Sequence, residues 1–255
     1  MVLPCDETGS GPALVLLHAG VADRRMWRGL LEPLADAGAR VLAPDLPGYG
    51  EAPAPQRSAV PWRDVLETID AHGIDRFALA GSSFGALVAK RVAVLAPGRV
   101  RSLALISPPG EDDDPSPQLA AAWEREEQAL ARGDIDAAVQ AVLETWLAPD
   151  APARQRELVA EMQRRAFELQ AGAGEVPYGP DPLELDPGAL ARLGCPVAIA
   201  VGELDMSDFH DAAAQLAAEL PGSTLQTIEG AGHLAPLERP RAVISLLGAL
   251  LASSA

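Results

Sequence analysis

The stretch that decides the fold runs from residue 77 to residue 95 and reads FALAGSSFGALVAKRVAVL. It begins with four apolar residues typical of a buried strand, and from Phe84 onward its apolar residues recur at helical spacing. Between the two, Gly81-Ser82-Ser83-Phe84-Gly85 has the G-x-S-x-G pattern of a sharp turn that exposes a serine hydroxyl. Ser83 is the candidate nucleophile, and the two glycines suit a turn in which side chains would clash. In other Gly-rich loops the same pattern is only a serine that caps a helix.

On either side of this stretch, short apolar runs alternate with segments of helical periodicity. Such runs are typical of parallel strands that are buried on both faces and connected by helices. Strands are expected at residues 13–17, 41–44, 77–80, 103–106, 197–201 and 224–228, and helices at 26–37, 62–72, 84–95, 209–220 and 241–250. The pattern predicts an α/β fold with a doubly wound, mostly parallel sheet, and at most one further strand fits ahead of residue 13.

The alternation breaks between the strands expected at 103–106 and 197–201. Helical periodicity continues there at residues 117–132, 135–147 and 152–170, after a loop that contains the acidic run Glu111 to Asp114. We expect this run to be a solvated surface, and a cation site is the alternative. The core domain is expected at residues 1–107 and 195–255, with residues 108–194 inserted as a helical cap, or lid, over a site.

Composition and charge narrow the class of protein. The length of 255 residues suits one domain, and 48% apolar with 22% charged residues is ordinary for a soluble globular protein. The formal net charge of −16 repels phosphate backbones and anionic head groups, so we expect no nucleic-acid or membrane partner. Only Cys5 and Cys195 are present, and residues 1–11 lack the pattern of a secretory leader, which predicts a cytoplasmic protein.

A serine hydroxyl is a weak nucleophile unless a base takes its proton, so the hypothesis requires a histidine. His233 lies just beyond the strand expected at 224–228, where loops at the carboxyl ends of strands build the sites of open α/β sheets. His72 lies at an expected helix end and His210 begins a later helix, so we interpret both as structural. His233 is the candidate general base.

The base needs an acidic partner that fixes its tautomer. Asp205 follows directly on the strand expected at 197–201, and Asp208 is close enough in sequence to compete. We choose Asp205 as the acid and expect Asp208 to be the N-cap of the helix near residue 209. Ser83, Asp205 and His233 each follow a different expected strand, so the fold can bring them together at one edge of the sheet.

A tetrahedral intermediate carries an oxyanion, which two preorganised N–H groups must stabilise. The residue after the nucleophile, Phe84, supplies one backbone N–H in this arrangement. The second is expected from Gly20, in the loop that follows the strand at 13–17, because glycine lets the backbone approach closely. Gly20 and Phe84 therefore form the expected oxyanion hole.

Together these stretches resemble the α/β-hydrolase superfamily. The set consists of Leu17-His18-Ala19-Gly20, similar to its His-Gly-x oxyanion motif, Pro44-Asp45-Leu46-Pro47-Gly48-Tyr49-Gly50, similar to its Pro-Asp-x-x-Gly-x-Gly loop, and Gly81 to Gly85, Gly202 to Asp205 and Gly230-Ala231-Gly232-His233. The similarity runs from about residue 11 to the C-terminus, and the order nucleophile, acid, base is the one expected there. Ala19 departs from the usual glycine. The resemblance implies the α/β-hydrolase fold, with His18 shaping the oxyanion loop.

Two further segments are similar to segments of small esterases and enol-lactonases within that superfamily. They are Met26-Trp27 after the oxyanion loop and Thr145-Trp146-Leu147-Ala148-Pro149 in the cap. Trp27, Trp123 and Trp146 are accordingly named as pocket-lining residues, and helix packing is the alternative for each of them.

The function expected from this resemblance is hydrolysis of small carboxylic esters or lactones through an acyl-enzyme intermediate, with no cofactor. Serine C–C bond hydrolases, cofactor-free haloperoxidases and a non-catalytic small-molecule receptor on the same scaffold are the alternatives. Haloalkane dehalogenases and epoxide hydrolases resemble one another in using an aspartate as the nucleophile in this sharp turn, where this chain has Ser83. Dispersed histidines without paired-cysteine spacing predict no metal site, and the oligomeric state is left open.

Overall fold

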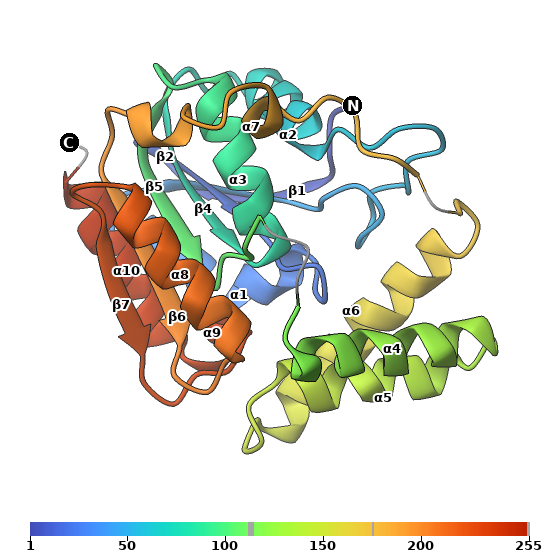
Figure 1. Ribbon diagram of the computed structural model, residues 1–255. Helices are drawn as coiled ribbons and strands as arrows, with labels where there is room; N and C mark the ends of the chain where they lie inside the picture. Colours follow the sequence, from blue (N-terminus) through green and yellow to red (C-terminus); the bar gives the residue numbers. More distant parts are fainter. Residues whose placement is uncertain (112–114, 175, 254–255) are drawn as a thin grey trace.

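Seven strands form one sheet in the part of the chain that the computed structural model describes, residues 1–111, 115–174 and 176–253 (Figure 1). Their order is β1-β3-β2-β4-β5-β6-β7. The strands are β1 (Cys5–Gly9), β2 (Ala13–Leu17), β3 (Arg40–Pro44), β4 (Phe77–Ser82), β5 (Val100–Ile106), β6 (Val197–Gly202) and β7 (Thr224–Ile228). β1 pairs antiparallel with β3, and the other neighbouring strands pair in parallel. The predicted mostly parallel sheet is confirmed, with β1 as the strand ahead of residue 13.

Helices cover both faces of the sheet, as a doubly wound fold requires. The 3-10 helix η1 (Arg24–Trp27) leads into α1 (Arg28–Asp36), which packs beside α10 (Pro240–Ser253) on one face. On the other face lie α2 (Pro61–Ala71), α3 (Phe84–Leu95) and α8 (Ser207–Glu219), while the short α9 (Ala235–Glu238) precedes α10. The expected core strands and helices begin and end within three residues of these bounds.

The insertion forms three helices that pack on one another beside the sheet: α4 (Pro117–Ala131), α5 (Ile135–Trp146) and α6 (Ala153–Gln170) (Figure 1). The Ser116 hydroxyl accepts from the backbone N–H of Leu119 at 3.2 Å, and the Asp134 carboxylate accepts from that of Ala137 at 3.0 Å. These side chains satisfy N–H groups that have no partner inside the helix, so they define where α4 and α5 begin.

After α6 the chain returns to the core. Tyr178 lies opposite Ala59 in an isolated parallel bridge, and α7 (Pro182–Leu185) and the 3-10 helix η2 (Leu190–Arg192) both contact α3. The expected cap, residues 108–194, thus includes a final segment that packs on the core rather than on α4, α5 and α6. None of the helices within the described ranges is both long enough and apolar enough to cross a membrane.

The acidic run expected to be solvated is only partly described, because Asp112 to Asp114 lie outside the described residues. Glu111 forms ion pairs with Lys90 and, at 2.9 Å, with Arg91. Both cations belong to α3 and are buried, so the Glu111 carboxylate compensates charges that have left water. The Glu111 side chain is 49% exposed, as expected, while its carboxylate pairs with these two buried cations.

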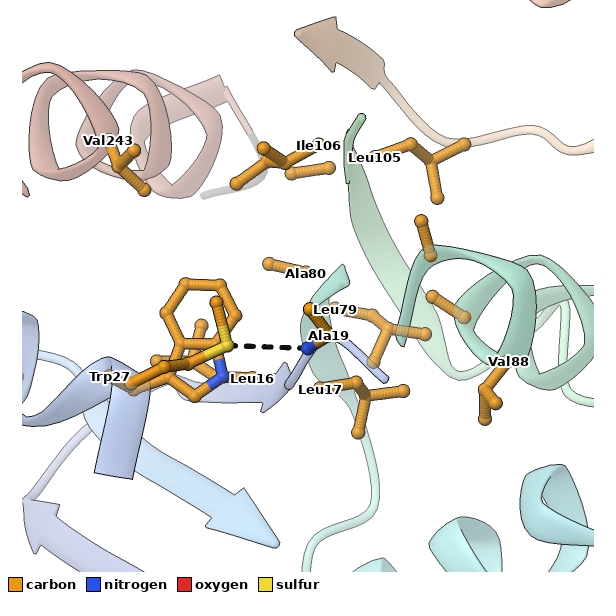
Figure 2. Close-up of a cluster of buried hydrophobic side chains, with 14 of the residues drawn as sticks. Leu16, Leu17, Ala19, Trp27, Leu79, Ala80, Val88, Leu105, Ile106 and Val243 are labelled. Carbon is orange, nitrogen blue, oxygen red and sulfur yellow. Dashed lines mark hydrogen bonds between the residues drawn. The ribbon is translucent and has the colours of Figure 1, made fainter. Parts of the chain in front are cut away.

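The apolar core lies between the sheet and its two helical layers. Figure 2 shows Leu16, Leu79 and Leu105 on adjacent strands, with Val88 of α3 on one side of the sheet and Val243 of α10 on the other. All five side chains are fully buried, and each contributes about 1.5–3 kcal/mol relative to an exposed side chain. This rigid sheet holds the loops at the carboxyl ends of its strands in place.

Candidate active site

Ser83 sits in the sharp turn between β4 and α3 with backbone angles φ 53° and ψ −116°. A β-carbon added to Gly81 would lie 2.1 Å from the Gly85 carbonyl oxygen, and one added to Gly85 would lie 2.2 Å from the Leu17 carbonyl oxygen. Both glycines are therefore required by close backbone contacts, as the sequence predicted. A positive φ is costly for serine, and such strain is typical of residues that the surrounding structure holds in place for function.

His233 and Asp205 form a buried pair at the ends of β7 and β6. The distances from His233 Nδ1 to the two carboxylate oxygens of Asp205 are 2.9 and 3.0 Å, and their side chains are 3% and 1% exposed. The backbone N–H of Met206 donates to Asp205 Oδ1 at 2.9 Å. Burial alone raises the pKa of Asp205, but the charge and hydrogen bond of His233 outweigh it and hold that pKa below its usual value. The pair can therefore keep an ionised carboxylate beside the imidazole.

Asp208 has different partners. Its carboxylate accepts from the backbone N–H and the hydroxyl of Ser116, both at 2.7 Å, at the start of the cap helix α4. The expectation that Asp208 is the N-cap of α8 was wrong, because α8 begins at Ser207 and its N-cap is Met206. Asp208 thus links α8 to the cap, and Asp205 is the carboxylate that contacts His233.

Two other histidines, His18 and His72, make structural contacts. His18 is fully buried, and its Nε2 accepts from the backbone N–H of Leu46 at 2.8 Å, so its Nδ1 carries the proton and donates to the Ala19 carbonyl at 2.9 Å. Burial lowers the pKa of His18, which favours this neutral form. His72 contacts the Thr68 carbonyl at the end of α2. His18 therefore fastens the loop after β2 to the loop after β3.

The two expected oxyanion donors lie on adjacent backbone segments. Gly20 follows β2 and Phe84 is the first residue of α3. A β-carbon added to Gly20 would lie 3.3 Å from Phe84 Cβ and 3.4 Å from the Tyr49 hydroxyl. Gly20 and the first residue of α3 therefore lie close together, which an oxyanion hole built from both residues would require.

Aromatic rings pack against the imidazole of His233. The ring centroids of Trp146 and Phe209 lie 4.6 and 4.3 Å from that of His233. Trp146 comes from the cap, whereas Phe209 belongs to α8 and was missed because its spacing resembled ordinary helix packing. Of the other tryptophans named from the sequence, Trp27 is fully buried in the core (Figure 2) and Trp123 is 49% exposed on α4. Only Trp146 of the three contacts a candidate catalytic residue.

A cavity of about 260 Å³ opens beside Phe84. Residues from three regions line it. These are Pro47, Tyr49 and Ala54 from the loop after β3, Phe84 at the start of α3, and Gln170 at the end of α6 with Tyr178 in the segment that follows. The described residues around this cavity carry no charged side chain. Such a surface suits an uncharged group, because an anion there would lose its water without gaining a partner.

Two buried carboxylates organise this region: Asp45, which belongs to the loop motif quoted from the sequence, and Glu238, which sequence reasoning did not single out. Asp45 is fully buried and accepts from the backbone N–H of Arg24 at 2.9 Å and of Glu51 at 2.8 Å, which closes the loop that carries Tyr49. Glu238 is also buried and accepts from two backbone N–H groups near His233. The only sequence signal for Glu238 is its position five residues after the candidate base. Within the described residues, no cluster of three His, Cys, Asp or Glu side chains suits a metal ion.

Comparison with known proteins gives a consistent result. The model of the Alpha/beta hydrolase family matches residues 14–246. The chain is 32% identical over 242 residues, or 91% of each protein, to a pimeloyl-(acyl-carrier protein) methyl ester esterase of Chromobacterium violaceum. The structure of a thermophilic esterase from Thermogutta terrifontis superimposes with a TM-score of 0.79 at 25% identity, covering 99% of this chain and 93% of that one.

One similarity is confined to part of a longer protein. A bifunctional epoxide hydrolase of Sus scrofa is 33% identical over 115 residues, which are 43% of this chain and 21% of that protein. The chain therefore spans about a fifth of the length of this relative.

Proposed function

This chain belongs to the alpha/beta hydrolase family, and on that premise we propose that it is a serine hydrolase of small carboxylic esters or lactones. The observation that carries the proposal is the buried His233–Asp205 pair at the ends of β7 and β6, at the same edge of the sheet as the strained Ser83 turn. A base with a fixed tautomer at the same edge of the sheet as a half-buried serine hydroxyl is the arrangement that acyl transfer requires.

In the proposed reaction, the Ser83 oxygen attacks the substrate carbonyl while His233 Nε2 takes the hydroxyl proton. The Asp205 carboxylate accepts from Nδ1 and stabilises the imidazolium that forms. The N–H groups of Gly20 and Phe84 donate to the oxyanion of the tetrahedral intermediate. His233 then protonates the leaving alcohol, and water releases the acyl group from Ser83 by the reverse sequence of proton transfers.

The cavity beside Phe84 supports an uncharged acyl group. Its volume of about 260 Å³ and its lining of apolar, tyrosine and amide side chains suit a short hydrocarbon chain. The esterase of Chromobacterium violaceum, similar along most of its length, supports an ester as the bond that is cleaved. We also place the enzyme in the cytoplasm, because Cys5 and Cys195 are both free thiols. We propose that it acts without a cofactor.

Epoxide hydrolysis is a weaker candidate despite the shared segment with the Sus scrofa relative. The residue at the turn is Ser83, and opening an epoxide with a serine oxygen would leave an ether, which water does not cleave by acyl chemistry. An ester or lactone carbonyl instead gives an acyl-serine that hydrolyses.

The test is hydrolysis of p-nitrophenyl acetate and butyrate, together with intact-mass detection of a fluorophosphonate adduct. Ser83→Ala should abolish both turnover and adduct, whereas the matched variant Ser82→Ala, in the same turn but fully buried, should keep both. Labelling of folded Ser83→Ala would reject the assignment. Folded wild-type protein that neither turns over nor labels would favour the receptor alternative, and turnover of a C–C substrate alone would favour that hydrolase class.

A further inference from the structure

Glu238, the last residue of α9, has a carboxylate that joins two parts of the molecule. Its side chain is buried, and Oε1 accepts from the backbone N–H of Ala148 at 2.6 Å while Oε2 accepts from that of Gly232 at 2.5 Å. Ala148 belongs to the connection between the cap helices α5 and α6, and Gly232 directly precedes His233. One carboxylate thus holds the cap and the loop of the candidate base at the same time.

The three segments meet closely at this point. A β-carbon added to Gly232 would lie 3.0 Å from the Ala148 nitrogen and 3.2 Å from Glu238 Oε2. Two residues before Ala148, the ring of Trp146 packs on His233. The Ala148–Glu238 hydrogen bond therefore holds in place the chain segment that puts Trp146 against the imidazole.

Among the residues that the structure describes, none forms an ion pair with the Glu238 carboxylate. The carboxylate is neighboured by the imidazole of His233, with Asp205 behind it, and by Arg239, whose guanidinium donates to the Glu238 carbonyl and lies 4.0 Å from Asp150 of the cap. Burial raises the pKa of Glu238, although the two backbone N–H groups and the nearby positive charges lower it in part. The ionised form is the one that accepts from both N–H groups at once.

We propose that Glu238 is a positioning residue that couples docking of the cap to alignment of His233. When the cap is docked, Glu238 holds Gly232 and Ala148 together, and Trp146 packs on the imidazole. Displacement of the cap breaks the bond to Ala148 and removes Trp146, so His233 is correctly oriented only in the closed enzyme. This inference rests on the proposed role of His233 as the general base.

The coupling also predicts how activity depends on pH. Protonation of Glu238 converts one acceptor oxygen into a hydroxyl, which cannot accept from the N–H that it faces. As pH falls, protonation of Glu238 should therefore cost wild-type kcat/KM about tenfold, the loss expected when a charge-assisted hydrogen bond is removed. The ratio of wild-type to Glu238→Gln kcat/KM should fall from about ten at high pH toward about one at low pH, because the glutamine side chain does not titrate.

The test compares Glu238→Gln with Glu203→Gln, a matched control. Glu203 is exposed and accepts from the Gly230 N–H of the same loop at 2.7 Å, but it does not bond to the cap. Glu238→Gln should slow fluorophosphonate labelling of Ser83 by about tenfold, as expected when a charge-assisted hydrogen bond is lost. It should also speed hydrogen exchange in residues 146–151, whereas Glu203→Gln should change neither quantity.

A second variant keeps the test decisive if Glu238→Gln does not fold. Ala148→Pro removes the cap N–H and leaves Glu238 and the His233 loop intact; Leu147 already has the extended backbone that precedes proline. It should also slow labelling. Labelling as fast as wild type in folded Glu238→Gln or Ala148→Pro, or a ratio of wild-type to Glu238→Gln kcat/KM that does not change with pH, would overturn the inference while wild type still labels. Wild type that does not label would instead overturn the proposed function itself.

Discussion

The substitution Asp205→Asn should reverse the tautomer of His233. The Met206 N–H donates to Asp205 Oδ1 at 2.9 Å, so an asparagine side chain would place its oxygen there to keep that bond. Its NH₂ group would then take the position of Oδ2, which now lies 2.9 Å from His233 Nδ1. Two donors cannot face each other, so Nδ1 would lose its proton and Nε2 would carry it instead. The nitrogen that faces the substrate could then no longer accept the Ser83 proton.

The expected loss follows from this geometry. A triad whose histidine is held in the wrong tautomer loses about 10⁴-fold in kcat, which corresponds to about 5 kcal/mol of transition-state stabilisation. Asp208→Asn is the matched control, because its carboxylate contacts Ser116 rather than His233, and we expect its kcat to stay within about threefold of wild type. The assay is p-nitrophenyl butyrate hydrolysis by both variants at equal folded fraction. Asp205→Asn activity within tenfold of wild type, or a larger loss in Asp208→Asn, would refute the reasoning.

Three further predictions concern stability and substrate choice. Ser83→Gly should be more stable than Ser83→Ala by about 1 kcal/mol in denaturant unfolding, because φ is 53° there, and equal stabilities would argue against strain at the turn. The pKa of Asp205 is lower in the folded protein than its unfolded value of 3.8, so the ionised carboxylate stabilises the fold above pH 3.8. Wild type should lose this stabilisation as pH falls through the folded-state pKa. Asp205→Asn should therefore show a weaker dependence of the melting temperature on acid pH. Hydrolysis of p-nitrophenyl butyrate should exceed that of the p-nitrophenyl monoester of succinate by at least about tenfold, because the cavity lining offers a carboxylate no partner, and comparable rates would place the acyl group elsewhere.

Local sequence features accounted for much of the fold. Residues 77–95 predicted a strand, a turn and a helix, and the structure has β4 and α3 there with the glycine contacts that the turn requires. The helices of the insertion were also predicted within one residue at each end. Apolar periodicity and turn chemistry act over a few neighbouring residues, so they are readable without the tertiary structure.

The contacts between distant residues were not readable in the same way. Asp205 and Asp208 are three residues apart and both acidic, and only the turn after β6 decides that Asp205 contacts His233 while Asp208 bonds to Ser116. Similarly, the sequence predicted that Glu111 is solvated, but it did not predict the ion pairs of Glu111 with Lys90 and Arg91 of α3. The sequence alone does not distinguish the partners of neighbouring acidic residues, because those partners depend on how the folded backbone orients each side chain.

The sequence by itself therefore determined the order of strands and helices, the Ser83 turn and the position of His233 after the last strand, because each depends on local spacing. The tertiary structure alone decided what surrounds His233. Trp146 and Ala148 lie about 90 residues before His233 and Glu238 in the chain, and they reach these partners only because the insertion packs against the segment that follows β7. No local pattern encodes that path, since it results from packing the whole insertion on the core.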